Sequence, residues 1–373
     1  MASSDDYSAA AGTNAVADQL TSLSVDEAAG TKPTTTDADA PAGGNNETVA
    51  NKVEIERFCS ACGKGGTTST LNKCGGCRCV FYCSRSCQMT HRKVHKRECK
   101  AIKEILKKRS ESGEIINEPP RLEPIGDLPP MEECPICMHV MPINESLRTI
   151  MMCCGKKVCG GCFFVGQKIN RGRNVEIACP FCREKQLSKI ELQGRLIKRA
   201  EEEEDALAIH ALSLRYAKGQ GGLPVDSKRA LELCFRSHEL GYREASHTLG
   251  TNYLFGHMGC VQDEEKAMSY FRLAAENLSI DAMYNLGVYE HMHDNYDLAI
   301  QFWRKAAAYG HLASIDNLIT NIFAENNICH ADLANSMQAK DKMRIEMKSE
   351  GRDLYIDYLK SKGRFQEEER FIP

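Results

Sequence analysis

The sequence of 373 residues lacks any run of about 18 consecutive apolar residues, so a membrane-spanning helix is not expected. Its start, MASSDDYSAAAGTNA, lacks the basic residues and apolar run that are typical of a secretory signal. It also lacks a strong overall charge, because the formal net charge is -3, which does not favour a nucleic-acid-binding polycation. We therefore expect an intracellular protein, cytoplasmic or nuclear, with no membrane attachment.

Cysteine, in contrast, is abundant, with 19 residues. Without export, cysteines in closely spaced pairs favour metal sites over disulfides. Eight lie between residues 57 and 100 and eight more between residues 134 and 182. The remaining three, Cys234, Cys260 and Cys329, are expected to be small buried apolar residues.

Changes in composition divide the chain into six parts. Residues 1–52 have few large apolar side chains, and the first 50 hold eight acids and one lysine, so we predict a disordered acidic tail. The cysteine clusters occupy 57–101 and 132–186, and a Pro-rich linker, 111–131, joins them. Helical repeats are predicted for 188–335, with Ser188 and Glu191 forming a capping box, and a C-terminal capping helix and tail for 336–373.

The repeats begin at alanines 39, 37 and 31 residues apart: Ala206, Ala245, Ala282 and Ala313. Each full copy has an Ala-x3-Leu helix, a turn, and a second helix around Ala230, Ala267 or Ala299. This pattern resembles Sel1-like repeats, relatives of tetratricopeptide repeats, over residues 206–315. The resemblance implies an α-solenoid with a protein-binding face. We thus expect a mainly α chain in which two small cross-braced zinc modules precede a solenoid.

The first cysteine cluster resembles a MYND finger in the stretch KCGGCRCVFYCSRSCQ and the following HKRECK. The resemblance implies interleaved pairs and two Zn2+ ions. One ion would take Cys59, Cys62, Cys83 and Cys87, and the other Cys74, Cys77, His95 and Cys99. Cys79 would be a spectator thiol, and His91 is either a second candidate ligand or a solvated surface residue.

MYND fingers are protein-interaction modules, and several bind Pro-x-Leu-x-Pro peptides. This chain has Arg92 where a tryptophan is common, and its own linker segment Pro120–Pro124 matches the peptide pattern. The linker is hypothesised to dock on the MYND finger of the same or another copy; the alternative is a chance match. Basic residues nearby also leave nucleic-acid binding as a minor alternative, although interleaved aromatic residues are missing.

The second cluster resembles a RING finger, with CPIC at one end and CPFCR at the other. The RING cross-brace implies that one Zn2+ is held by Cys134, Cys137, Cys159 and Cys162. A histidine usually stands three residues before Cys159, but this position is Lys156, a poor ligand. The remaining donors are Cys153 and Cys154, which would join Cys179 and Cys182, with Gly155 supplying the tight turn.

A RING finger implies a ubiquitin ligase that binds a ubiquitin-charged E2 enzyme and holds no catalytic nucleophile. The matching E2 or ubiquitin contacts are Ile136, Pro180 and Arg183, with Phe163, Phe164 or Val165 as a further apolar contact. Every predicted zinc has four protein ligands, which disfavours a zinc hydrolase because such enzymes keep an open position. We therefore predict a RING-type E3 ligase whose MYND finger and repeats bind substrates. A non-enzymatic scaffold is the alternative, and a nucleic-acid-associated regulator the minor one.

Overall fold

The computed structural model describes residues 57–67, 69–112, 119, 121–143, 147–172, 178–185, 187–325 and 327–363. The predicted acidic tail, residues 1–52, lies outside the described residues. Strands are short and paired in three hairpins: β1 (Arg57–Phe58) with β2 (Gly65–Gly66), β3 (Asn72–Lys73) with β4 (Phe81–Tyr82), and β5 (Arg148–Ile150) with β6 (Lys157–Cys159). Within the described residues, none of the helices combines the length and apolar character that crossing a bilayer requires.

Helices form most of the structure. They are α2 (Arg85–Ser112), α3 (Gly160–Gly172), α4 (Lys189–Glu201), α5 (Ala206–Lys218), α6 (Ser227–Glu239), α7 (Arg243–Phe255), α8 (Glu264–Glu276), α9 (Ile280–Met292), α10 (Tyr296–Ala308), α11 (Leu312–Asn317), α12 (His330–Glu346) and α13 (Glu350–Ser361), with a 3-10 turn η2 (His257–Gly259) and a π-helical segment η3 (Leu318–Phe323). This mainly α architecture with two small modules confirms the predicted fold class.

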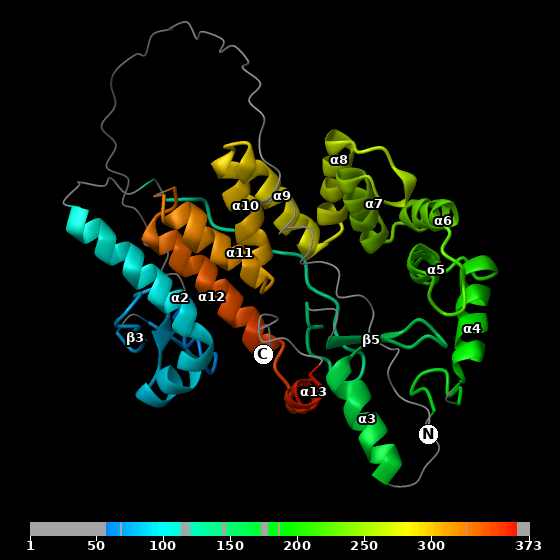
Figure 1. Cartoon of the computed structure of the whole chain (residues 1–373). Coiled ribbons are helices and arrows are strands. Elements are labelled where there is room, and N and C mark those ends of the chain that lie inside the picture. The colour runs from blue at the N-terminus through cyan, green and yellow to red at the C-terminus, as the bar shows by residue number, and fades with distance from the viewer. Residues whose placement is uncertain are drawn as a thin grey trace, which may run out of the picture.

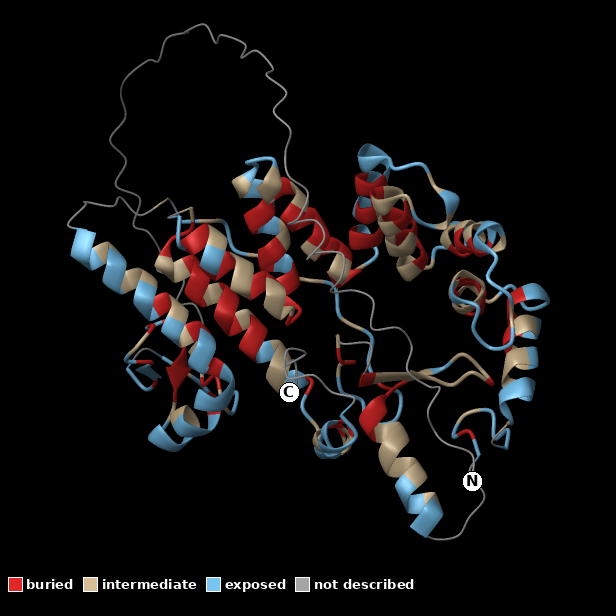
Figure 2. Cartoon of the chain, viewed as in Figure 1, coloured by how far each residue is buried: buried red, intermediate tan, exposed pale blue. Residues whose placement is uncertain are grey.

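The helices from α4 to α12 form an arc, and the two small modules lie at different places along it (Figure 1). The first module, with α2, lies beside α12, while β5 and α3 lie at the open side of the arc next to α13 (Figure 1). Buried residues gather where α9, α10 and α12 pack together, whereas the outer ends of α2 and α3 are exposed (Figure 2).

Polar side chains at the predicted turns determine where the repeat helices begin and end. Asp205, Asp226 and Asp263 accept a backbone N–H at the starts of α5, α6 and α8. Gly219 and Gly256 end α5 and α7 in the left-handed conformation, at φ 64° and 67°. The predicted capping box of α4 is also present, with both of its hydrogen bonds formed.

The register of the first and fourth repeats differs from our prediction. The buried small residue equivalent to Ala245 and Ala282 is Ala208 in the first copy, and Ser314 in the fourth; all four are 0% exposed. Ala206 and Ala313 are only half-buried. The Ala-x3-Leu spacing itself fits Ala208 with Leu212, whereas Ala206 is followed by His210 at that spacing, so our prediction aligned the first copy on the wrong alanine.

In the second and third repeats, a glycine on the first helix packs against a large aromatic side chain on the second helix. Gly250 packs against Phe271, and Gly287 packs against the indole of Trp303. A Cβ built on Gly287 would lie 2.4 Å from the Trp303 Nε1 atom. Glycine at these sites is therefore required by close helix–helix packing, since both positions have ordinary helical backbone.

We predict that Gly287→Ala destabilises the protein by about 1–3 kcal/mol, because the added methyl overpacks the contact with Trp303. Denaturant titration would measure the change. Gly194→Ala is the matched control, because Gly194 also lies in a helix and its Cβ would meet nothing within 4 Å. The higher helix propensity of alanine should raise the stability of this variant by up to about 1 kcal/mol. Equal effects of the two substitutions would contradict this account.

The C-terminal helices α12 and α13 contact the two small modules, which our prediction of a capping helix did not include. The expected boundary between residues 335 and 336 falls inside α12, which runs without interruption from His330 to Glu346. This helix packs on the first module, while α13 packs against α3 of the second module, where Phe164 contacts Tyr355 and Tyr358. The C-terminal helices therefore connect both modules to the repeats.

A buried cluster of charges joins α12 to α2. Lys340 Nζ lies 2.5 Å from Glu98 Oε1, and Asp341 Oδ1 lies 3.3 Å from His91 Nε2. Arg344 extends the contact by donating to the Ser60 carbonyl at 2.5 Å. All of the α2 and α12 side chains in these pairs are buried or nearly so, which makes the loss of any one partner costly.

Removing the Asp341 carboxylate should destabilise the chain by about 3–5 kcal/mol, since Asp341→Ala leaves Lys340 and His91 without this partner. Burial opposes ionisation of Asp341, but Lys340 above all, then His91 and Arg344, lower its pKa. The stabilisation is thus present above the usual aspartate pKa of about 4 and is lost as pH falls below it. Thermal melting at pH 7 and pH 3.5 checks this. The exposed Asp357→Ala should change little at either pH.

Candidate metal centres

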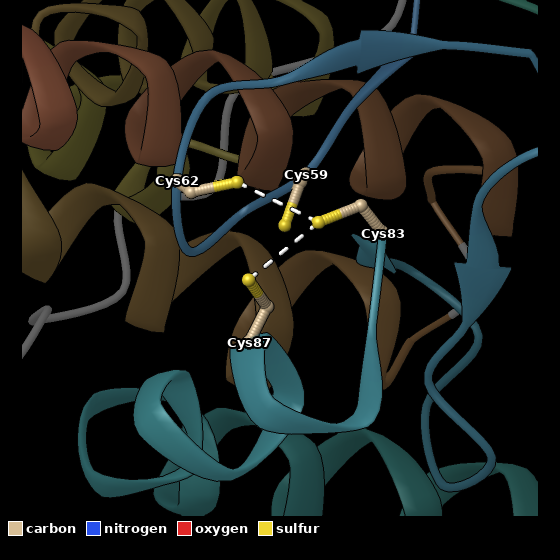
Figure 3. Close-up of side chains that lie close together, drawn as sticks. All are labelled: Cys59, Cys62, Cys83 and Cys87. Carbon is tan, nitrogen blue, oxygen red and sulfur yellow. Dashed lines mark hydrogen bonds between the residues drawn. The ribbon is translucent and has the colours of Figure 1, made fainter.

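The first module brings its predicted ligands together as two separate groups of four. In each group, the donor atoms all lie within 4.8 Å of one another. The members are Cys59, Cys62, Cys83 and Cys87 in one group, and Cys74, Cys77, His95 and Cys99 in the other. Figure 3 shows the four sulfur atoms of the first group converging from two segments of chain, the β1–β2 turn and the start of α2.

The second module shows the same convergence. Cys134, Cys137, Cys159 and Cys162 form one group, and Cys153, Cys154, Cys179 and Cys182 form the other, each again within 4.8 Å. The adjacent cysteines both reach one group, because Cys154 and Gly155 donate to the Met151 carbonyl and close a tight turn. Gly155 has φ 73°, as expected for this turn, and Lys156 is exposed.

Distances between the donors fit a tetrahedral zinc ion. A Zn–S bond of about 2.3 Å places tetrahedral sulfur atoms about 3.8 Å apart. The sulfur pairs Cys62–Cys83, Cys74–Cys99, Cys154–Cys179 and Cys137–Cys159 are separated by 3.6, 3.7, 3.7 and 3.9 Å. The donor sets, four thiols or three thiols and one imidazole, are those that structural zinc sites use.

Four of the five CxxC pairs adopt the same backbone turn, whereas the fifth, Cys159 with Cys162, leads into α3. In those four pairs the residue after the second cysteine is left-handed, as in Met138 (φ 55°) and Arg183 (φ 58°). Its N–H donates to the carbonyl of the first cysteine: Gly63 to Cys59 (2.9 Å), Arg78 to Cys74 (3.0 Å), Met138 to Cys134 (2.8 Å) and Arg183 to Cys179 (3.0 Å). A non-glycine residue in this conformation costs about 1–2 kcal/mol, so the surrounding structure has to compensate for it.

Backbone amides prepare the first cysteine of each module for metal binding. Burial alone raises the pKa of a thiol, but amides of Cys83, Ala61 and Cys62 hydrogen-bond to Cys59 and lower its pKa to about 7. Burial likewise opposes ionisation of Cys134, whose pKa is lowered to about 7 by amides that include that of Cys159. Because zinc binds thiolates, these amides favour the state that a metal requires.

Two residues near the first module, His91 and Cys79, lie outside both donor groups. His91 is not a solvated surface residue, because it is 3% exposed, hydrogen-bonds Tyr82 and contacts Asp341. It also lies outside both donor groups, which supports His95 as the ligand position. Cys79 joins neither group and lies 3.3 Å from His330 Nε2 at the start of α12.

Arginines of α4 hold the turn that carries the adjacent cysteines. Arg195 donates to the Cys153 carbonyl at 3.0 Å, and Arg199 donates to the Met152 carbonyl at 3.2 Å. Arg199 is 1% exposed and is paired with Asp205. No local sequence pattern indicates this contact, since the arginines lie more than 40 residues from the turn.

The predicted E2 contacts lie around a groove of about 290 Å³ in the second module. Ile136 and Pro180 line it together with Phe163, while Arg183 is exposed beside Cys182. Of the three apolar candidates on α3, Phe163 faces this groove and Phe164 faces α13. Leu192 of α4 lines it as well, which the sequence did not indicate.

Within the described residues, the linker does not dock on the first module of its own chain, which was one of our two hypotheses; docking on another copy stays a prediction. The described part of the segment lies on α10 and α12: the Leu122 N–H donates to Asp332 at 2.9 Å, and Arg304 donates to the Glu123 carbonyl at 3.1 Å. Tyr309 donates to the Pro129 carbonyl further along. Leu122 is half-buried and packs on the core cluster, which includes buried residues of α10 and α12. Pro120 lies outside the described residues.

The fold and donor groups together define a modular protein in which a zinc finger precedes an α-solenoid. Comparison with known families specifies both parts: the MYND finger family matches residues 59–99, and the Sel1 repeat family matches residues 206–242, 244–277 and 280–311. The chain therefore contains a MYND finger and three Sel1 repeats. The RING interpretation of the second module stays a prediction.

Individual relatives match parts of the chain. A chitin synthase regulator, SKT5, of Malassezia restricta is 31% identical over 32% of this chain and 9% of its own. The Arabidopsis thaliana histone-lysine N-methyltransferase ASHR1 is 39% identical over 16% of this chain and 12% of its own. A Sel1 repeat protein from Oxalobacter formigenes is 29% identical, with a TM-score of 0.31, covering 34% of this chain and 96% of that one. This chain spans about a tenth of the length of the curated relatives.

If the adjacent cysteines share one ion, Cys153→Ala should reduce the zinc content of the purified chain by one ion. Zinc released by a thiol-modifying reagent would be counted with a colorimetric chelator. Cys234→Ala is the control, because this buried cysteine of α6 belongs to none of the four groups, and it should leave the count unchanged. An unchanged count in Cys153→Ala would show that Cys154 binds without its neighbour.

Proposed function

We propose that this protein is a RING-type ubiquitin ligase in which the second module recruits a ubiquitin-charged E2 enzyme. The MYND finger and Sel1 repeats are interaction modules and would bind the substrates. Each of the four donor groups would hold one Zn2+ ion, whose role is structural because all four positions are taken by protein ligands. The ions would fix the loops, and the chain's own side chains would contact the E2.

The observation that carries this proposal is the shared groove of Ile136, Phe163 and Pro180. These residues come from the first CxxC turn, α3 and the last CxxC turn, so three separate segments supply one apolar surface. Ile136 is 45% exposed although it is a large apolar residue, and exposed apolar residues that converge on a groove favour a protein partner.

In the part of the chain that the structure describes, the groove is also available to a large partner. α13 covers the opposite side of α3, where it contacts Phe164, and the linker lies on α10 and α12. Arg183 adds an exposed cation beside the apolar surface, in the position where a RING finger contacts both E2 and ubiquitin. Its backbone is left-handed and its N–H donates to the Cys179 carbonyl, so the last CxxC turn fixes its position.

Ligase activity is tested by autoubiquitination of the full chain with a panel of E2 enzymes. Ile136→Ala and Arg183→Ala should each slow the reaction at least about tenfold, which corresponds to about 1.4 kcal/mol. Ile169→Ala is the matched control, because this α3 isoleucine is equally exposed but does not line the groove. No activity with any E2 would favour the non-enzymatic scaffold. Activity that is insensitive to Ile136 would contradict the proposed surface.

A further inference from the structure

Arg352, in the first turn of α13, is buried against the second module. It is 2% exposed, and its guanidinium donates to the Val140 carbonyl at 2.7 Å, to the His139 carbonyl at 3.4 Å and to the Met347 carbonyl. Its Nη2 atom also lies 3.7 Å from the sulfur of Cys137. Three of the four acceptors therefore belong to one short stretch, 137–140, which directly follows Ile136.

The charge of this arginine is compensated in an unusual way. A buried arginine is normally paired with a carboxylate. The contacts of Arg352 within the described residues are carbonyls and one cysteine sulfur instead. Four thiolates around one Zn2+ carry a net charge of about −2, and Cys137 is one of those four donors. The guanidinium thus faces the negative side of the proposed metal centre.

The stretch that Arg352 contacts is paired with residues 132–134 through its backbone, because the Cys134 N–H donates to the His139 carbonyl at 2.9 Å and the Met141 N–H donates to the Glu132 carbonyl at 2.8 Å, but its side chains are poorly packed. Met138 is 68% exposed and has φ 55°, a conformation that is unfavourable for a residue other than glycine. Ile136 is also half exposed, so apolar packing contributes little on this side. The Val140 and His139 carbonyls therefore depend on hydrogen bonds, and the forked guanidinium can bind both at once.

The position of α13 is itself fixed by close contact with α3. A Cβ on Gly161 would lie 2.5 Å from the backbone nitrogen of Arg352 and 2.6 Å from the Gly351 carbonyl carbon. The two helices therefore approach each other at their first turns, where only glycine fits on α3. Ser349 caps α13 by accepting the Arg352 N–H at 3.4 Å, which directs the arginine toward the stretch.

We propose that Arg352 is a positioning residue for the E2-binding surface. It holds residues 137–140 so that Ile136 faces the groove. The E2-binding surface therefore depends on α13, although this helix and the second module are about 170 residues apart in the sequence. The predicted effect of Arg352 on ligase activity rests on the proposed function, whereas its predicted effect on the stretch 137–140 does not.

Autoubiquitination of the full chain, measured against E2 concentration, tests the effect on activity. Arg352→Ala should raise the KM for E2 about tenfold, with kcat at saturating E2 and the zinc count unchanged. Arg352→Lys should recover part of the loss, because an ammonium can still donate to one carbonyl. Arg344→Ala is the matched control: it removes an arginine of α12 that donates to Ser60 of the MYND finger, and it should not change this KM. An unchanged KM in Arg352→Ala would overturn the proposal.

Amide hydrogen exchange tests the same residue without ligase activity. Exchange of the amides of residues 136–140 should be at least tenfold faster in Arg352→Ala and intermediate in Arg352→Lys. If Arg352→Ala fails to fold, the test rests on Arg352→Lys. Exchange rates in Arg352→Lys that equal those of the wild type would then overturn the proposal. If the wild-type chain is inactive with every E2, the proposed ligase function is refuted. The exchange experiment still tests whether Arg352 holds residues 137–140.

Discussion

Donor atoms from segments distant in the sequence have to meet at one point, and this requirement shapes both small modules. In each group, one CxxC pair forms a compact turn, and a second pair from another segment completes the group. The strands that connect the pairs are only two or three residues long, too short to make a stable sheet by themselves. We therefore propose that the modules depend on metal ligation, which would also hold the left-handed turn residues in place.

The C-terminal helices connect the two small modules to the repeats. α12 reaches the MYND finger through the buried pairs of Lys340 and Asp341, and α13 reaches the second module through Arg352. On the other side, α4 holds the turn at Cys153. The E2-binding surface that we propose is thus framed by helices from both ends of the repeat region, and its geometry depends on the intact chain.

The sequence predicts the local features well and the long-range contacts poorly. Ligand spacing, the capping box at Ser188 and the periodicity of the repeats are short-range patterns, and each is recognisable because its residues lie within a few positions of one another. The docking of the linker on Arg304, the burial of His91 and the role of Arg352 depend on residues far apart in the chain. No local pattern encodes such pairs, so hydrogen bonds across the fold revealed them.

The central claim is that all four donor groups hold zinc. Anomalous X-ray scattering from crystals of the full chain, recorded on both sides of the zinc absorption edge, tests it most directly. The account predicts four peaks, with one of them equidistant from the sulfur atoms of Cys153, Cys154, Cys179 and Cys182. Peaks confined to the MYND finger would contradict the account, because the proposed E2-binding surface would then lack the metal that fixes its loops.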